Sequence, residues 1–151
     1  MLKNILLTVF ISSYIFANSF KISDQIGSFS LPDQFDKMHI INQNIQTILV
    51  SFEKGTSTDI NRFLASKEAD YLNKHKSVFI ANITDMPSFI TRLFAIPKMR
   101  KYKHKILLIN NEHDDRFIFK DDKITVYKLE HGIIKDIYYI DSNYETLKKA
   151  F

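Results

Sequence analysis

The four residues after Gly55 carry side chains that could do chemistry at the start of a predicted helix. They are three hydroxyls and one carboxylate: Thr56, Ser57, Thr58 and Asp59. A helix N-terminus offers unpaired N–H groups and a positive partial charge, which favour an anion. A hydroxyl nucleophile would also need a base within hydrogen-bond reach, and no histidine adjoins this stretch. We therefore predict helix capping or ligand binding here, and we assign no catalytic residue.

The segment from residue 98 to 105 is the densest run of positive charge. Its cations are Lys98, Arg100, Lys101, Lys103 and Lys105. Such a run could bind anionic lipid, a cell-wall polymer or an acidic partner protein. Cations also complement the backbone dipole at the C-terminal end of a helix, so a solvated helix end is the alternative. We predict these five residues as candidate binding residues.

A short acidic segment is the third candidate, because carboxylates and an imidazole can hold a divalent ion. It is Glu112-His-Asp-Asp115. Its spacing lacks the alternating acidic positions and the central glycine of a calcium loop. We therefore predict a solvated turn and no metal site. The other histidines are scattered, and we predict surface positions for His39, His75, His104 and His131.

Two kinds of absence in the sequence exclude classes of function. The chain has no cysteine, which excludes disulfides, thiolate metal sites and thiol catalysis. Its three glycines, Gly27, Gly55 and Gly132, lie far apart, so no Gly-rich phosphate loop is present. We predict that the protein has no cofactor.

The N-terminus has the three-part pattern of a secretory signal peptide. Lys3 precedes the apolar run Ile5 to Phe16, and small residues follow at Ala17-Asn-Ser19. The run is short for a bilayer span. We predict cleavage after Ser19, with Ala17 as second choice and an uncleaved anchor as the alternative. The protein would then be periplasmic, or would lie outside a cell with a single membrane.

Residues 20–151 suit one domain, and 45% of the chain is hydrophobic, which excludes disorder. The formal net charge of +4 is a mild excess, and the export signal disfavours nucleic acid as a partner.

Continuous apolar runs predict three strands that are covered on both faces: Ile48–Phe52, Ser77–Ile83 and Ile106–Ile109. After the first, Ser57 or Thr58 can cap a helix, with Asp59 in its first turn, that runs to about Asn73 or His75. After the second, Thr84–Pro87 begins a helix whose apolar face is Phe89, Ile90, Leu93 and Phe94. Pro97 ends or bends it.

The two ends of the domain predict further elements. Lys123–Leu129 and Ile133–Ile140 form a hairpin about Glu130-His-Gly132. Ser142-Asn-Tyr-Glu145 forms a capping box before a last helix. Phe20 to Met38 predicts an irregular extension with a small strand or hairpin, and His39 to Ile45 a second short strand. Arg116 to Lys120 fits either a strand or a short helix.

This order of elements resembles the thioredoxin fold, an α/β three-layer fold with a mixed central sheet, a C-terminal β-hairpin and a capping helix. Ile48–Phe52 with its loop and helix looks like the strand that leads to the thioredoxin active site. Lys123–Gly132 with Ile133–Phe151 looks like the closing hairpin and helix. Phe29–Lys37 is similar to the lead-in of peroxiredoxin-like proteins. The pattern is most similar to the YtfJ-type family of small exported bacterial proteins.

The chain departs from the active members of this superfamily where they react. The two cysteines of the thioredoxin Cys-x-x-Cys motif correspond to positions near Ser57 and Ile60. If the peroxiredoxin Thr-x-x-Cys motif is aligned from Thr56, Asp59 stands in the position of its cysteine. The proline that precedes the closing hairpin in thioredoxins is absent around Asp122-Lys123. The resemblance therefore implies the scaffold without thiol redox chemistry.

Three functions stay open. The first is a periplasmic binding or accessory module that holds a peptide or an envelope protein. The second is an enzyme with non-thiol chemistry at the loop Thr56–Asp59. The third is an envelope-associated protein that binds anionic partners or a membrane surface through Lys98–Lys105. An open apolar groove would favour the binding module. A histidine or acid clustered with the hydroxyls would favour the enzyme. A basic face beside exposed aromatic side chains would favour the envelope-associated protein.

Overall fold

The computed structural model describes residues 19–151. The predicted leader, apart from Ser19, lies outside these residues. Among the described residues, no helix is long and apolar enough to cross a membrane.

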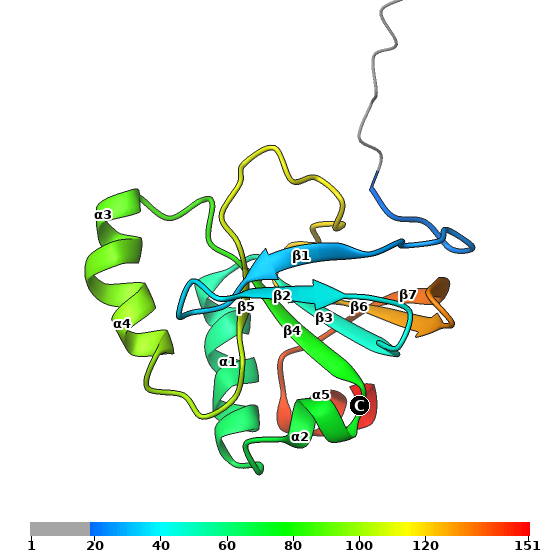
Figure 1. The fold of residues 1–151 in the computed structure, drawn as a ribbon. Helices are drawn as coiled ribbons and strands as arrows, with labels where there is room; N and C mark the ends of the chain where they lie inside the picture. The colour runs from blue at the N-terminus through cyan, green and yellow to red at the C-terminus, as the bar shows by residue number, and fades with distance from the viewer. Residues whose placement is uncertain (1–18) are drawn as a thin grey trace, which may run out of the picture.

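A five-stranded mixed sheet forms the centre of the molecule (Figure 1). β3 is its middle strand, and all of its residues are buried because the sheet is covered on both faces. β3 pairs in parallel with β4 and antiparallel with β6. The order across the sheet is β5 (Leu107–Ile109), β4 (Ser77–Asn82), β3 (Thr47–Ser51), β6 (Ile124–Glu130) and β7 (Ile133–Ile140). The predicted strands and the closing hairpin are confirmed.

Helices cover one face of the sheet. They are α1 (Lys54–Ala65), α2 (Tyr71–Lys74) and α5 (Tyr144–Ala150). Ile60 and Phe63 of α1 and Leu147 of α5 pack with Leu49 and Phe79 from the strands. Side chains of a strand alternate between faces, so Leu49 points to the helices while Ile48 and Val50 point to the other side.

A hairpin covers the second face. It consists of β1 (Phe29–Pro32) and β2 (Met38–Ile41), which pair antiparallel, and it confirms the predicted N-terminal hairpin. Leu31 and Ile41 pack with Val50 and Ile80 of the sheet. Phe117 completes this cluster from the predicted ambiguous segment 116–120, which forms neither strand nor helix. The Tyr127 hydroxyl accepts the Ile118 N–H and so holds the segment as irregular chain.

A bent helical segment lies beside α1 (Figure 1). It consists of α3 (Ser88–Ile90), the π-helical turn η1 (Thr91–Ala95) and α4 (Ile96–Met99). Pro97 lies in the first turn of α4, and because it has no N–H it cannot hydrogen bond to the turn before it. A π-helical register accommodates such an interruption, so the helix continues through Pro97 instead of ending there.

The predicted bounds of α1 are wrong at both ends. The helix begins at Lys54 with Glu53 as N-cap, so neither Ser57 nor Thr58 caps it, and Asp59 lies beyond its first turn. The hydroxyl of Thr58 donates to the backbone oxygen of Lys54 instead of accepting an N–H, a bond that competes with capping. The helix ends at Ala65, and Tyr71 begins the separate helix α2.

The predicted capping box of the last helix is also wrong, by one residue. Asn143 is the N-cap, and its side-chain oxygen accepts the N–H of Thr146 at 3.0 Å. The Ser142 hydroxyl donates to a carboxylate oxygen of Asp59 at 2.6 Å instead. This long-range bond ties the start of α5 to α1 and removes Ser142 from capping.

We predict opposite effects of alanine at two glycines. Gly132 has φ +79°, and an added Cβ would lie 2.6 Å from Nε2 of Gln25. Gly132→Ala should therefore destabilise the protein by about 1–2 kcal/mol. Gly55 lies in α1 with open space around an added Cβ, so Gly55→Ala should stabilise it by about 0.5–1 kcal/mol. Urea unfolding of both variants measures the difference, and a shift of the same sign in both would contradict this account.

Candidate functional site

A cavity of about 540 Å³ lies between α1 and the segment Ser88–Met99. Phe52 and Asn82 border it at the ends of β3 and β4, because both strands end at this edge of the sheet. The start of α1 therefore lies at the carboxyl edge of the sheet, but Thr56–Asp59 are helical, so the predicted loop at these residues is wrong.

The two walls of the cavity differ in polarity. The wall from α1 is a polar stripe with helical spacing, formed by Lys54, Ser57, Thr58 and Asn61. The opposite wall is mostly apolar and is formed by Met86, Ile90, Phe94, Ala95 and Met99. Lys98, Glu53 and Asp85 add charge at the same cavity. The site thus offers apolar surface with a few polar groups, the usual composition of a binding pocket.

The structure separates the four residues of the first candidate. Ser57 and Thr58 line the cavity. Thr56 is buried, and its hydroxyl donates to the backbone oxygen of Glu53. Asp59 accepts bonds from Arg62 at 2.8 Å and Ser142 at 2.6 Å, so its carboxylate supports the fold.

Ser57 lacks the activation that hydroxyl catalysis needs. Its hydroxyl shares a short hydrogen bond with that of Ser51, a fully buried residue at the end of β3. Within residues 19–151 no histidine or carboxylate hydrogen bonds to Ser57. A nucleophilic serine requires such a base, so this hydroxyl is arranged to join β3 to α1.

A buried polar pair that the sequence analysis missed joins Asn61 of the cavity wall to the loop behind it. His104 is 3% exposed, and its Nε2 lies 2.8 Å from Oδ1 of Asn61. Tyr102, which lines the cavity, stacks on the His104 ring with 5.1 Å between centroids. The prediction of a surface position for His104 is wrong. The usable signal was the alternation of Tyr102, His104 and Ile106 with Lys103 and Lys105, which indicates that one side of this segment is buried.

Burial also changes the acidity of His104. Its Nδ1 has no hydrogen-bond partner in the described part of the chain, and burial lowers its pKa to about 4. Gln34 holds the same loop from the β1–β2 turn, since its Nε2 donates to the His104 oxygen at 2.9 Å. Its Oε1 accepts the Ile106 N–H at 2.9 Å. Neutral His104 therefore packs into a loop that Gln34 of the β1–β2 turn holds in place.

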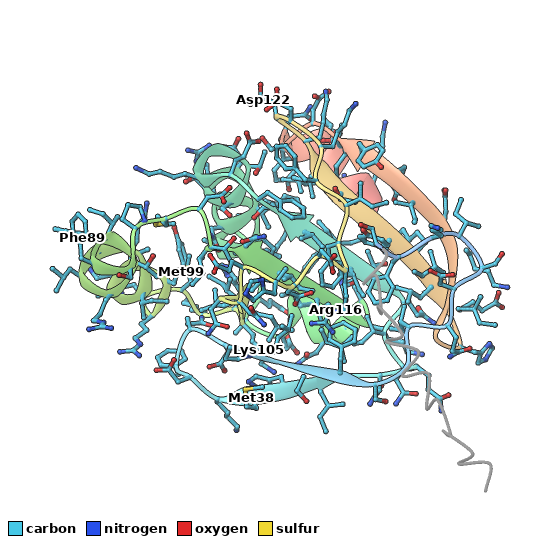
Figure 2. All side chains as sticks on the ribbon, turned by 90° about the horizontal axis from the view of Figure 1, so that it is seen from above. Met38, Phe89, Met99, Lys105, Arg116 and Asp122 are labelled. Atoms are coloured by element: carbon cyan, nitrogen blue, oxygen red, sulfur yellow. The ribbon has the colours of Figure 1, made fainter. Side chains whose placement is uncertain are left out.

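The five cations of the basic run do not share one site. Lys98 reaches the cavity, whereas Lys105 lines a second hollow of about 300 Å³ with His39 and Ile40. Arg100 donates to the Gln34 oxygen at 2.7 Å and pairs with Asp36 at 3.3 Å. Lys101 and Lys103 are exposed. Figure 2 shows Lys105 well apart from the outer end of the helix at Phe89. The role of these five cations in binding stays a prediction.

Acidic groups gather outside the segment Glu112–Asp115, for which the sequence predicts a solvated turn. In Glu112–Asp115, both oxygens of Asp114 accept bonds from the Arg116 guanidinium, so they are not free for a cation. Glu53, Asp121 and Asp122 instead offer oxygens that lie within 4.8 Å of one another beside the start of α1. Glu53 also accepts the Asp122 N–H at 2.9 Å. The sequence concealed this cluster because its members lie far apart along the chain.

Comparison with known proteins identifies the fold. No family model matches the chain, and no curated protein matches it. The solved structures that resemble it along most of their length include three whose names contain peroxiredoxin, peroxidoxin or thioredoxin. A peroxiredoxin-like protein from Aquifex aeolicus has 10% identity and a TM-score of 0.53, covering 88% of this chain and 87% of that one. The thioredoxin domain of a thiol-disulfide oxidoreductase from Bacteroides vulgatus has 16% identity and a TM-score of 0.52, covering 87% and 98%.

The third is a peroxidoxin from Mycobacterium tuberculosis, with 14% identity and a TM-score of 0.50, covering 86% of this chain and 93% of that one. At such identities the likeness concerns the fold alone. The link to YtfJ-type proteins stays a prediction. The expected architecture is confirmed: the chain has a thioredoxin-like fold, with peroxiredoxin-like neighbours and without cysteine.

We predict that His104 makes the stability of the protein depend on pH. In the unfolded chain its pKa is near 6.5, so between about pH 6.5 and pH 4 the unfolded state binds the extra proton. The contribution of neutral His104 is complete above pH 6.5 and is lost as the pH falls. By linkage the free energy of unfolding should fall by about 2 kcal/mol between pH 7 and pH 4.8.

The matched comparison is His104→Gln, which keeps an N–H for Asn61 and cannot titrate, with the exposed His113→Gln as control. Urea unfolding at each pH should show a weaker pH dependence only for His104→Gln. Equal pH profiles for all three proteins would show that His104 is not the titrating group.

Proposed function

We propose that this protein is an exported, non-redox thioredoxin-like binding module. Its cavity between α1 and Ser88–Met99 would hold an apolar side chain of a peptide or of another envelope protein. The described residues contain no thiol. The carboxyl edge of the sheet, which carries the cysteine in redox-active thioredoxins, could therefore bind a ligand without reacting with it. We assign no catalytic step to the site.

The cavity is the observation that carries this proposal. Its volume of about 540 Å³ lies in the range of small-ligand pockets, about 300–1,000 Å³. Met86, Ile90 and Met99 supply apolar contact, and methionine adapts to ligands of irregular shape. Thr58 and Asn61 face them across the cavity and can orient the ligand backbone through hydrogen bonds. A ligand with one apolar and one polar edge suits this arrangement.

The proposal that the protein is exported is based on the leader sequence alone. Lys3, the apolar run Ile5–Phe16 and the small residues Ala17-Asn-Ser19 form a signal peptide pattern. A protein that lacks cysteine needs no disulfide machinery in an oxidising compartment. We therefore place the mature protein in the periplasm, where its partners would be envelope proteins or peptides.

Filling the cavity should abolish peptide binding. Peptides selected from a displayed random library against residues 20–151 should be rich in apolar residues. Their dissociation constants should rise about tenfold or more for Ala95→Phe, because the added ring occupies the cavity. Isothermal titration calorimetry measures the change.

The control for this experiment is Ala65→Phe, which adds the same ring at the exposed end of α1. It should bind the selected peptides as the parent protein does. Equal binding by Ala95→Phe would place the peptides elsewhere, and a library that yields no binder would overturn the proposed function.

The leader makes a separate prediction. When the full chain is produced in a Gram-negative host, the periplasmic fraction should contain a product whose mass corresponds to a start at Phe20. Replacing the small residues by Ala17→Asp/Ser19→Asp should block cleavage, because the peptidase requires small side chains there. Recovery of the uncleaved parent chain from the cytosol would contradict export.

A further inference from the structure

The apolar face of the segment Ser88–Met99 is turned to solvent. Phe89 is 60% exposed, Leu93 63% and Phe94 64%. Helices of soluble proteins normally bury their apolar stripe. A cavity separates this segment from α1, and Phe94 borders the cavity while its side chain stays largely exposed. Figure 2 shows Phe89 at the outer edge of the molecule, away from the sheet.

Positive charge dominates the segment that contains this face, although Asp85 precedes the segment and Asp36 lies beside Arg100. From residue 86 to 111 the sequence contains no aspartate or glutamate. It contains six cations, all exposed: Arg92, Lys98, Arg100, Lys101, Lys103 and Lys105. Only Arg100 has a carboxylate partner among the described residues, Asp36 at 3.3 Å. The exposed apolar helix thus continues directly into a segment of unpaired positive charge.

A neighbouring element extends the same surface. Arg100 lies over the ring of Phe35 at 5.9 Å, and Phe35, in the β1–β2 turn, is 56% exposed. Because Arg100 also donates to the Gln34 oxygen at 2.7 Å, this turn is fixed against the end of α4. The exposed ring of Phe35 therefore lies beside Arg100 at the end of the helical segment.

We propose that this surface docks on a membrane that contains anionic phospholipids. Helices that lie in a membrane interface combine Phe and Leu on one face with Lys and Arg on the other. Lipid phosphates complement the carboxylate-free stretch, and the acyl boundary accepts Phe89, Leu93 and Phe94. A folded acidic protein would also match the charge, but the exposed rings favour an apolar layer beneath the anions.

Vesicle sedimentation tests the docking. The protein used is residues 20–151, which contains both core clusters and omits the apolar run Ile5–Phe16, which would itself bind lipid. It should bind vesicles with about 30% phosphatidylglycerol and bind pure phosphatidylcholine far more weakly. Binding should weaken as NaCl is raised from about 0.05 M to about 0.5 M.

Two pairs of variants separate apolar from charged contacts. Phe89→Ser/Leu93→Ser should weaken binding about tenfold or more, whereas Ile22→Ser/Tyr139→Ser, which also removes two exposed apolar side chains, should not. Lys101→Gln/Lys103→Gln should weaken binding and flatten its salt dependence, whereas Lys148→Gln/Lys149→Gln in α5 should leave both unchanged. Circular dichroism checks that every variant is folded.

Three outcomes would overturn the proposal. The first is equal sedimentation with neutral and anionic vesicles, or none with either. The second is equal loss of binding in the test and control pairs. The third is a drop in oligomeric mass for Phe89→Ser/Leu93→Ser without loss of vesicle binding, which would assign the face to a second copy of the chain. None of these substitutions fills the cavity. Peptide binding by the same variants therefore tests the proposed function separately from vesicle binding.

Discussion

The passage of β3 directly into α1 is the constraint on which the rest of the structure depends. All residues of β3 are buried, and the strand pairs with β4 on one side and β6 on the other. The hydrogen bond between Ser51 and Ser57 joins its last residue to the first turn of the helix. Since β3 cannot shift without disturbing both neighbours, the polar stripe of α1 is held at the carboxyl edge of the sheet.

The chain has no cysteine, so that edge of the sheet presents a cavity and no thiol. The cavity beside α1 exists because Ser88–Met99 stands away from the helix and touches the core mainly through Met99 and Ile96. Gln34 and Arg100 hold the far end of this segment to the β1–β2 turn. The segment therefore serves as one wall of the cavity and, on its other side, exposes the apolar face that we assign to a membrane.

The strands could be predicted because continuous apolar runs such as Ile48–Val50 carry their own signal. The start of α1 could not, since Thr58 can either cap a helix or donate to a carbonyl within it, and the local sequence does not decide between them. Asn143 replaced Ser142 as a cap because Asp59, far away in the chain, binds Ser142. Such choices depend on contacts that form only after folding.

From the sequence we predicted part of the cavity wall at the start of α1 but none of the apolar wall that faces it. Ser57 and Thr58 were named, yet the opposite wall comes from a helix whose apolar face the sequence could equally place in a core. His104 and Asn61 meet only because the loop before β5 packs on α1. Glu53 and Asp122 likewise meet only through tertiary structure. The local sequence around either residue of such a pair does not predict the contact.

Amide chemical-shift mapping with indole, a small apolar probe, tests the central claim most directly. The account predicts saturable shifts in isotope-labelled protein that concentrate at Ser57, Asn61, Met86, Ile90 and Met99, around the cavity, and that vanish in Ala95→Phe. Shifts that spread over β2 and β7, or no shifts at the cavity, would contradict the claim that this edge of the fold is a binding site.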